Sequence, residues 1–123
     1  MNLEIEAKKF LKRKNMSNIT ATEYQNKAKE TAIFPADKAL EYLSLGLVGE
    51  AGEVANKVKK LIRDKKVLHD TTVISSEIGD VLWYCAMLAD YLDVNLGKIM
   101  DDNLDKLKSR KQRGTLGGTG DNR

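Results

Sequence analysis

Residues 37–63 of the chain read DKALEYLSLGLVGEAGEVANKVKKLIR, and this stretch decides the fold. Its apolar residues recur at steps of three and four, which is the spacing that places side chains on one face of a helix. The stretch therefore predicts one long helix that ends near Arg63. Its apolar face consists of Leu40, Leu43, Leu47, Ala51, Val54, Val58 and Leu61.

A second stripe runs along one border of that apolar face. Glu50, Glu53, Lys57 and Lys60 follow the same steps of three and four. On a wheel of about 100° per residue they share one side of the helix, beside the apolar residues. The acids are therefore expected to border the core without lying at its centre.

A second acidic pair, Glu77 and Asp80, lies in the stretch SSEIGDVLWY. Residues three apart on a helix share a face, so each of the two pairs offers two carboxylates to one point. Four converging carboxylates need cations, and hard cations such as Mg²⁺ prefer oxygen ligands. The pattern therefore predicts either tight pairing with basic residues or a site for a divalent cation, Mg²⁺ with Mn²⁺ as an alternative, formed by Glu50, Glu53, Glu77 and Asp80.

Glycines interrupt both acidic segments. Gly46, Gly49, Gly52 and Gly79 all fall inside patterns that otherwise predict continuous helix. Each weakens a helix by about 1 kcal/mol relative to alanine. We expect them to allow close approach between two helices, or between a helix and a ligand.

Three further helices are predicted. Thr20 followed by Glu23 has the form of a capping box and opens a helix to about Ala32. After the polar loop 64–72, a third helix reaches about Tyr91, and Asn95 is a plausible N-cap of a fourth helix that ends near residue 113. The inward positions of the last two helices are expected to be Ile78, Leu82, Cys85, Ala89 and Leu92, then Leu96, Met100, Leu104 and Leu107.

These elements predict an all-α bundle of four main helices, completed by oligomerisation to a homodimer or homotetramer. A charged lead-in occupies residues 1–18, the domain residues 19–113, and a flexible glycine-rich tail residues 114–123. Tyr84 lies one turn beyond Asp80 on the acidic side of its helix. Trp83 points elsewhere on the wheel and is expected to serve packing or an oligomer contact.

Composition narrows the classes of protein further. No stretch approaches the roughly 18 to 20 apolar residues that cross a bilayer, and the N-terminus lacks the apolar core of a signal peptide. We therefore expect a cytoplasmic protein without a membrane partner. Because His69 is the only histidine, the chain cannot supply the histidine ligands of a di-iron carboxylate bundle. The lone Cys85 excludes an internal disulfide framework.

Basic residues crowd the end of the chain, although the net charge is only +3. Asn103, Lys106 and Arg110 share one face of the fourth helix at steps of three and four. An acidic cage that faces a basic segment suits a metal-bound polyphosphate.

The chain resembles the MazG-like nucleotide pyrophosphohydrolases, an all-α family marked by ExxE followed later by ExxD. The matching residues are Glu50-Ala51-Gly52-Glu53 within GLVGEAGEVANKVKK and Glu77-Ile78-Gly79-Asp80 within EIGDVLWY, together with the pattern of Asn103, Lys106 and Arg110. The likeness extends from about Tyr24 to the C-terminus. The basic lead-in departs from the family, and the chain lacks the second domain of its longest members.

The resemblance implies Mg²⁺-dependent hydrolysis of a nucleoside triphosphate, or its deoxy form, to monophosphate and pyrophosphate, in nucleotide-pool housekeeping. It implies metal binding by the four motif acids and phosphate binding by Lys106 and Arg110, with Asn103 on the same face. Glu50 is the preferred candidate for activating the water, and Gln25 and Tyr84 are candidates for contacting the base.

The sequence leaves two alternatives open. One is a non-enzymatic helical dimer with a nucleic-acid-binding or regulatory role, although this does not explain the glycines beside the carboxylates, and we do not expect a nucleic-acid partner. The other is a related pyrophosphohydrolase that acts on phosphoribosyl-ATP.

Overall fold

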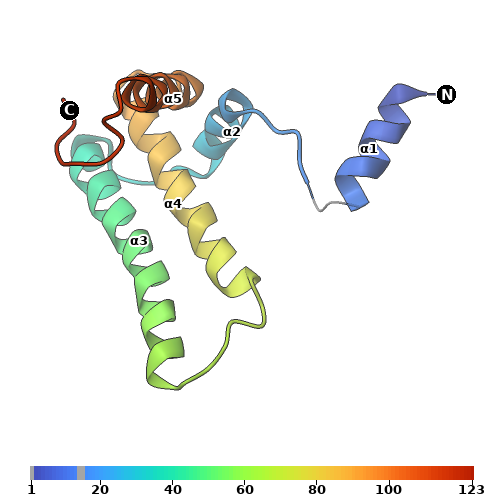
Figure 1. The fold of residues 1–123 in the computed structure, drawn as a ribbon, viewed down its shortest axis with the longest axis horizontal. Helices are drawn as coiled ribbons and strands as arrows, with labels where there is room; N and C mark the ends of the chain where they lie inside the picture. Colours follow the sequence, from blue (N-terminus) through green and yellow to red (C-terminus); the bar gives the residue numbers. More distant parts are fainter. Residues whose placement is uncertain (1, 14–15) are drawn as a thin grey trace.

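The computed structural model describes residues 2–13 and 16–123, and every regular element within them is helical (Figure 1). Short 3₁₀ turns at Lys29–Thr31 and Ala36–Lys38 join some of the longer elements. The predicted all-α class is confirmed. The α-helices are α1 (Leu3–Arg13), α2 (Ala21–Ala28), α3 (Ala39–Arg63), α4 (Thr72–Tyr91) and α5 (Leu96–Gln112).

Both predicted N-caps are confirmed. The Thr20 hydroxyl accepts a hydrogen bond from the Glu23 amide at 3.1 Å, and the Glu23 carboxylate accepts one from the Thr20 amide at 3.5 Å. The Asn95 side chain accepts a hydrogen bond from the Lys98 amide at 3.0 Å. These bonds satisfy amides that have no partner inside the helix, so they define where α2 and α5 begin.

The long helices α3 and α4 form the body of the molecule. They lie side by side, run in opposite directions and are joined by the loop 64–71 (Figure 1). Helices α2 and α5 pack at the end of this pair where α3 begins and α4 ends, while α1 stands apart from them. The antiparallel arrangement brings the middle of α3 against the first half of α4, where the two acidic pairs lie.

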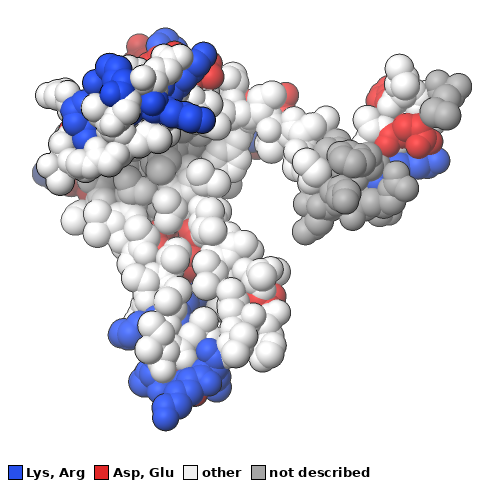
Figure 2. Space-filling view, in the orientation of Figure 1, with Lys and Arg blue, Asp and Glu red and all other residues white. Residues whose placement is uncertain are grey.

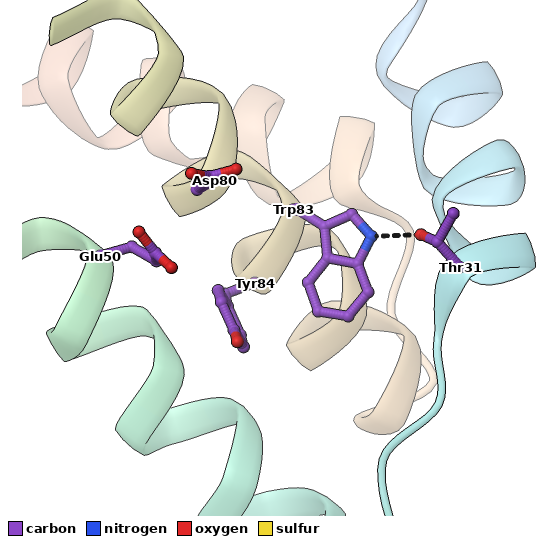
Figure 3. Close-up of a pocket in the computed structure, with 5 residues that line it drawn as sticks. All are labelled: Thr31, Glu50, Asp80, Trp83 and Tyr84. Atoms are coloured by element: carbon purple, nitrogen blue, oxygen red, sulfur yellow. Dashed lines mark hydrogen bonds between the residues drawn. The ribbon is translucent and has the colours of Figure 1, made fainter. Parts of the chain in front are cut away.

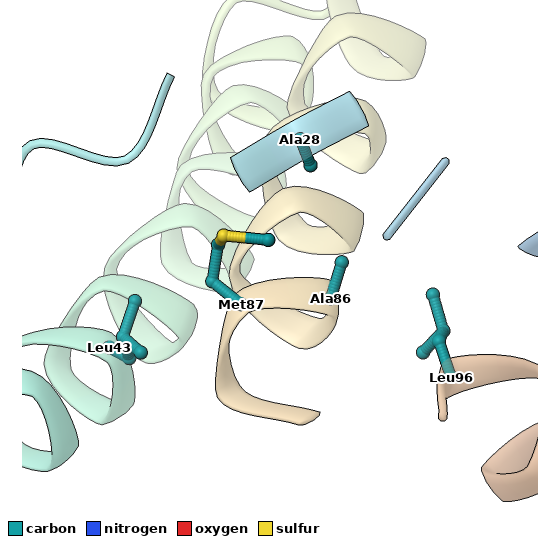
Figure 4. Close-up of a cluster of buried hydrophobic side chains, with 5 residues drawn as sticks. All are labelled: Ala28, Leu43, Ala86, Met87 and Leu96. Atoms are coloured by element: carbon teal, nitrogen blue, oxygen red, sulfur yellow. The ribbon is translucent and has the colours of Figure 1, made fainter. Parts of the chain in front are cut away.

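The buried core lies at the end where α2 and α5 cover the pair (Figure 4). Among the described residues, Leu43 is the largest side chain that is fully buried. Its partners in the core are Ala28, Ala86, Met87 and Leu96, with Tyr24, Phe34, Trp83, Tyr84 and Leu88 packed around them.

The apolar faces predicted from the sequence are only partly covered within this chain. Leu43, Ala89 and Leu96 are buried as expected, but Met100 is 52% exposed and Leu104 is 64% exposed. The expectation that these faces point inward is therefore corrected for the single chain. The reason is geometric, because α2 and α5 cover one end of the α3–α4 pair and leave the remaining faces without a helix against them. The other exposed members are Leu40, Ala51, Val58, Ile78, Leu82, Leu92 and Leu107.

The glycine-rich tail makes several hydrogen bonds in the structure, and its flexibility stays a prediction. The Arg113 guanidinium donates a hydrogen bond to the Arg123 carbonyl at 2.9 Å, and that of Arg123 donates to the Leu116 carbonyl at 3.3 Å. Gly118 and Gly120 have positive φ values of 87° and 85°, which non-glycine residues rarely adopt. The tail thus folds back over the C-terminal end of α5.

Within the residues that the structure describes, no helix combines the length and apolar character needed to span a membrane.

Candidate functional site

Three carboxylates meet between α3 and α4. Glu50 from α3 and Glu77 and Asp80 from α4 each place one oxygen within 4.8 Å of the others. Glu50 and Glu77 are half-buried and Asp80 is exposed. In Figure 3, Glu50 and Asp80 project from opposite helices toward the same space, and Figure 2 shows acidic surface between the two long helices. The oxygen-only donor set suits a hard divalent cation. We call these residues the carboxylate trio.

Glu53, the fourth predicted ligand, lies outside the trio. It is exposed on α3, one turn beyond Glu50, and it does not join the oxygens that meet within 4.8 Å. Its charge nevertheless contributes to raising the pKa of Glu50. The structure therefore brings three of the four predicted ligands together and leaves the fourth beside them.

A lysine contacts one member of the trio. The Lys57 ammonium lies 2.6 Å from Oε1 of Glu77 and donates a hydrogen bond to the Val73 carbonyl at 2.8 Å. Lys57 was visible in the sequence as a member of the stripe that carries Glu50 and Glu53. Its ion pair with Glu77 depends on the packing of α3 against α4, so Lys57 was not among the predicted site residues.

The two half-buried glutamates have opposite pKa shifts. Burial is the main cause that raises the pKa of Glu50, followed by a shared hydrogen bond with Glu77 and by the charge of Asp80. The hydrogen bond from Lys57 is the main cause that lowers the pKa of Glu77. Of the two glutamates, Glu77 therefore favours the ionised form and Glu50 has the greater affinity for a proton.

An open hollow of about 310 Å³ adjoins the trio. Tyr84 lines it, as expected from its position one turn beyond Asp80, and so does Trp83, which the sequence assigned to packing or an oligomer contact. The Trp83 indole donates a hydrogen bond to the Thr31 hydroxyl at 2.8 Å (Figure 3). The two aromatic rings meet edge to face with centroids 5.0 Å apart. The hollow thus joins carboxylates to aromatic surface.

One of the four glycines has a clear packing reason. A Cβ atom at Gly46 would lie 2.1 Å from Cε1 of Tyr84, whereas at Gly49, Gly52 and Gly79 it would meet nothing within 4 Å. The expected close approach is therefore found at Gly46, where α3 makes room for the tyrosine ring of α4. The other three glycines face open space beside the acids.

The basic residues of α5 are not in contact with the trio. Asn103 and Lys106 border a separate hollow on α5. Arg110 is only 5% exposed, and its guanidinium donates a hydrogen bond to the Asp121 carbonyl at 2.6 Å. The Asp121 carboxylate lies 3.6 Å from Arg110 and 3.9 Å from Lys106. In the described part of the chain, no hydrogen bond or ion pair joins either cation to the carboxylates.

Gln25 lies in the framework of the fold. Its amide nitrogen donates to the Val94 carbonyl at 2.9 Å, and its amide oxygen accepts from the Leu96 amide at 2.7 Å. Since Gln25 is buried and both ends of its amide are engaged, it links α2 to the junction between α4 and α5. Contact between Gln25 and a base stays a prediction that this geometry does not support.

Comparison with known proteins identifies the family. A family model described as the MazG nucleotide pyrophosphohydrolase domain matches residues 38–115, which include the trio, Lys57 and the basic residues of α5. The gene 37 protein of Mycobacterium phage L5 is 49% identical over 109 residues, which cover 81% of this chain and 96% of that protein. No solved structure matches the chain significantly.

Proposed function

Because the chain belongs to the MazG nucleotide pyrophosphohydrolase family, we propose that it hydrolyses nucleoside triphosphates or their deoxy forms to monophosphate and pyrophosphate, with Mg²⁺ as its cofactor. One observation carries the proposal: three carboxylate oxygens from two helices lie within 4.8 Å of one another. When bound there by Glu50, Glu77 and Asp80, Mg²⁺ would neutralise phosphate charge and favour ionisation of water.

Glu50 is the group to which we assign the proton of the attacking water. A general base must lie within reach of the proton that it takes up. Glu50 lines the hollow beside the trio, whereas the Glu77 carboxylate is engaged by the Lys57 ammonium. In this assignment, Glu77 and Asp80 would bind and position the metal ion, and Glu53 would add negative charge from the neighbouring turn.

The nucleotide base would pack against the aromatic side of the hollow. Tyr84 and Trp83 line this hollow together with Glu50 and Asp80, so a base on the aromatic rings would place its phosphates toward the carboxylates. Flat apolar rings of this kind attract a base without selecting one. Cytosolic nucleotide-pool housekeeping is the role that such a site would serve.

A second copy of the chain would complete the domain. The apolar side chains left exposed on α4 and α5 include Leu82, Leu92 and Leu104, and large exposed apolar faces mark interaction surfaces. A dimer or tetramer would cover these faces and could bring the basic face of one α5 toward the trio of another copy. Sedimentation of the full chain tests this, and a monomer at micromolar concentration would contradict it.

The decisive experiment is a panel of nucleotides incubated with the protein and Mg²⁺ in ¹⁸O-labelled water. Attack at the α-phosphorus puts the label in the monophosphate and releases unlabelled pyrophosphate. Label in orthophosphate or pyrophosphate would overturn the proposed site of attack. Phosphoribosyl-ATP belongs in the panel, because exclusive turnover of that compound would favour the related activity instead. Binding of DNA or RNA without any hydrolysis would favour the non-enzymatic alternative.

A further inference from the structure

Lys57 is the one cation in direct contact with the trio among the residues that the structure describes. Its ammonium contacts Glu77 at 2.6 Å and the Val73 carbonyl at 2.8 Å, both on α4, while its own backbone belongs to α3. The Lys57 side chain is 29% exposed and that of Glu77 is 14% exposed. This pair is therefore much better shielded from water than a typical surface ion pair.

The contact gives Lys57 two physical effects on the site. It holds the first turns of α4 against α3, because the ammonium bridges a backbone carbonyl and a side chain one turn apart. It also supplies one positive charge to three carboxylates whose oxygens lie within 4.8 Å. Without that charge, the three acids would repel one another with no counter-ion in contact.

We propose that Lys57 is a positioning residue of this site: its ammonium is the resident counter-ion of Glu77, and a divalent cation must compete with it for that carboxylate. This inference rests on the proposed function, because it takes the trio as the metal site. Lys57 lies outside the acidic motifs, and its role is inferred from the contacts of its side chain.

The two effects of Lys57 would change metal affinity in opposite directions. Losing the tether makes Glu77 less ordered, which weakens binding slightly. Losing a unit charge a few ångströms from a divalent cation strengthens binding on the order of tenfold, even at the high effective dielectric of a partly open site. The charge effect is the larger one, so removing Lys57 should tighten Mg²⁺ binding.

The test measures Mg²⁺ binding to the full chain by calorimetry, with Mg²⁺ alone and no nucleotide. The variant Lys57→Met removes the charge while keeping a long, helix-compatible side chain. Lys57→Gln also removes it but keeps a hydrogen-bond donor, so it carries the test if the methionine variant does not fold. Lys57→Arg preserves the charge. Lys60→Met is the matched control, because Lys60 is exposed on the same stripe one turn further along α3.

We expect Lys57→Met to bind Mg²⁺ on the order of tenfold more tightly than the wild-type protein, while Lys57→Arg and Lys60→Met stay close to it. In EDTA, Lys57→Met should melt below Lys60→Met, because only the former strips the trio of its counter-ion. Unchanged or weaker Mg²⁺ binding by both Lys57→Met and Lys57→Gln would overturn the inference alone. If the wild-type chain binds no Mg²⁺, the proposed function fails and the inference falls with it.

Discussion

Alanine at Gly46 should destabilise the protein, whereas alanine at Gly49 should stabilise it. Both glycines lie inside α3, so each substitution gains about 1 kcal/mol of helix propensity. Only at Gly46 does the new methyl group meet an obstacle, 2.1 Å from Cε1 and 2.3 Å from Cζ of Tyr84. Carbon atoms in ordinary contact lie about 3.5 Å apart, so the ring must move by about 1.4 Å.

Other aromatic rings pack against part of the Tyr84 ring, and the open hollow borders another part of it. Trp83 meets it edge to face at 5.0 Å and Tyr42 lies at 6.4 Å between ring centroids. Overpacking of this kind costs about 1 to 3 kcal/mol. Because the propensity gain is common to both variants, their unfolding free energies should differ by about that overpacking cost. At about 4 °C per kcal/mol for a domain of this size, the melting temperatures should separate by about 4 to 12 °C.

The assay is thermal unfolding of Gly46→Ala and Gly49→Ala in EDTA at one protein concentration, followed by circular dichroism. The control repeats both glycine substitutions in a Tyr84→Ala background. With the ring removed, the difference in melting temperature between the two alanine variants should disappear. A Gly46→Ala variant that melts at or above Gly49→Ala would refute the reasoning. Hydrolysis by Gly46→Ala should also fall, because the open hollow beside the trio is the direction in which the ring can move.

Three other predictions concern the charged residues. Asp80→Asn should nearly abolish Mg²⁺-dependent pyrophosphate release while the helical spectrum persists, and near-normal turnover would remove the trio from the site. In EDTA, Glu50→Gln should melt above the wild-type protein at neutral pH, because a folded-state pKa above the unfolded value makes ionisation of Glu50 destabilising. That difference should shrink as the pH falls through the unfolded pKa of about 4.3 and vanish well below it, where Glu50 is protonated in both states, and a difference that persists there would contradict the assignment. In the proposed oligomer, where the basic face of one α5 approaches the trio of another copy, Arg110→Ala should reduce kcat/KM by about 1 to 3 kcal/mol of transition-state stabilisation. Asp121→Ala removes the tail carboxylate beside Arg110 but keeps the cation, so it should not; equal losses in both would mean that Arg110 acts only through the tail.

The opposite pKa shifts of Glu50 and Glu77 show how packing separates two similar residues. Both are half-buried glutamates in the same trio. The Lys57 ammonium contacts Glu77 and lowers its pKa, whereas burial is the main cause that raises the pKa of Glu50. The difference between the two glutamates therefore comes from the packing of α3 against α4.

Local features of the chain could be predicted from the sequence. The capping box at Thr20, the N-cap at Asn95 and the periodicity of α3 depend on residues within one or two turns of each other, and these predictions are confirmed. The placement of Glu77 with Asp80 on one helix face follows from the same short-range geometry. The family resemblance rested on these local motifs, and the match over residues 38–115 confirms it.

Contacts between helices were decided by the tertiary structure alone. Which acids meet depends on the rotation and register of α3 against α4, and this packing brings Glu50 into the trio, leaves Glu53 outside and pairs Lys57 with Glu77. The same packing explains the glycine at position 46, because a side chain there would clash with a tyrosine 38 positions away in the sequence. Periodicity fixes the face on which a residue lies but not the partner opposite that face, because the partner is set by how side chains interlock between helices.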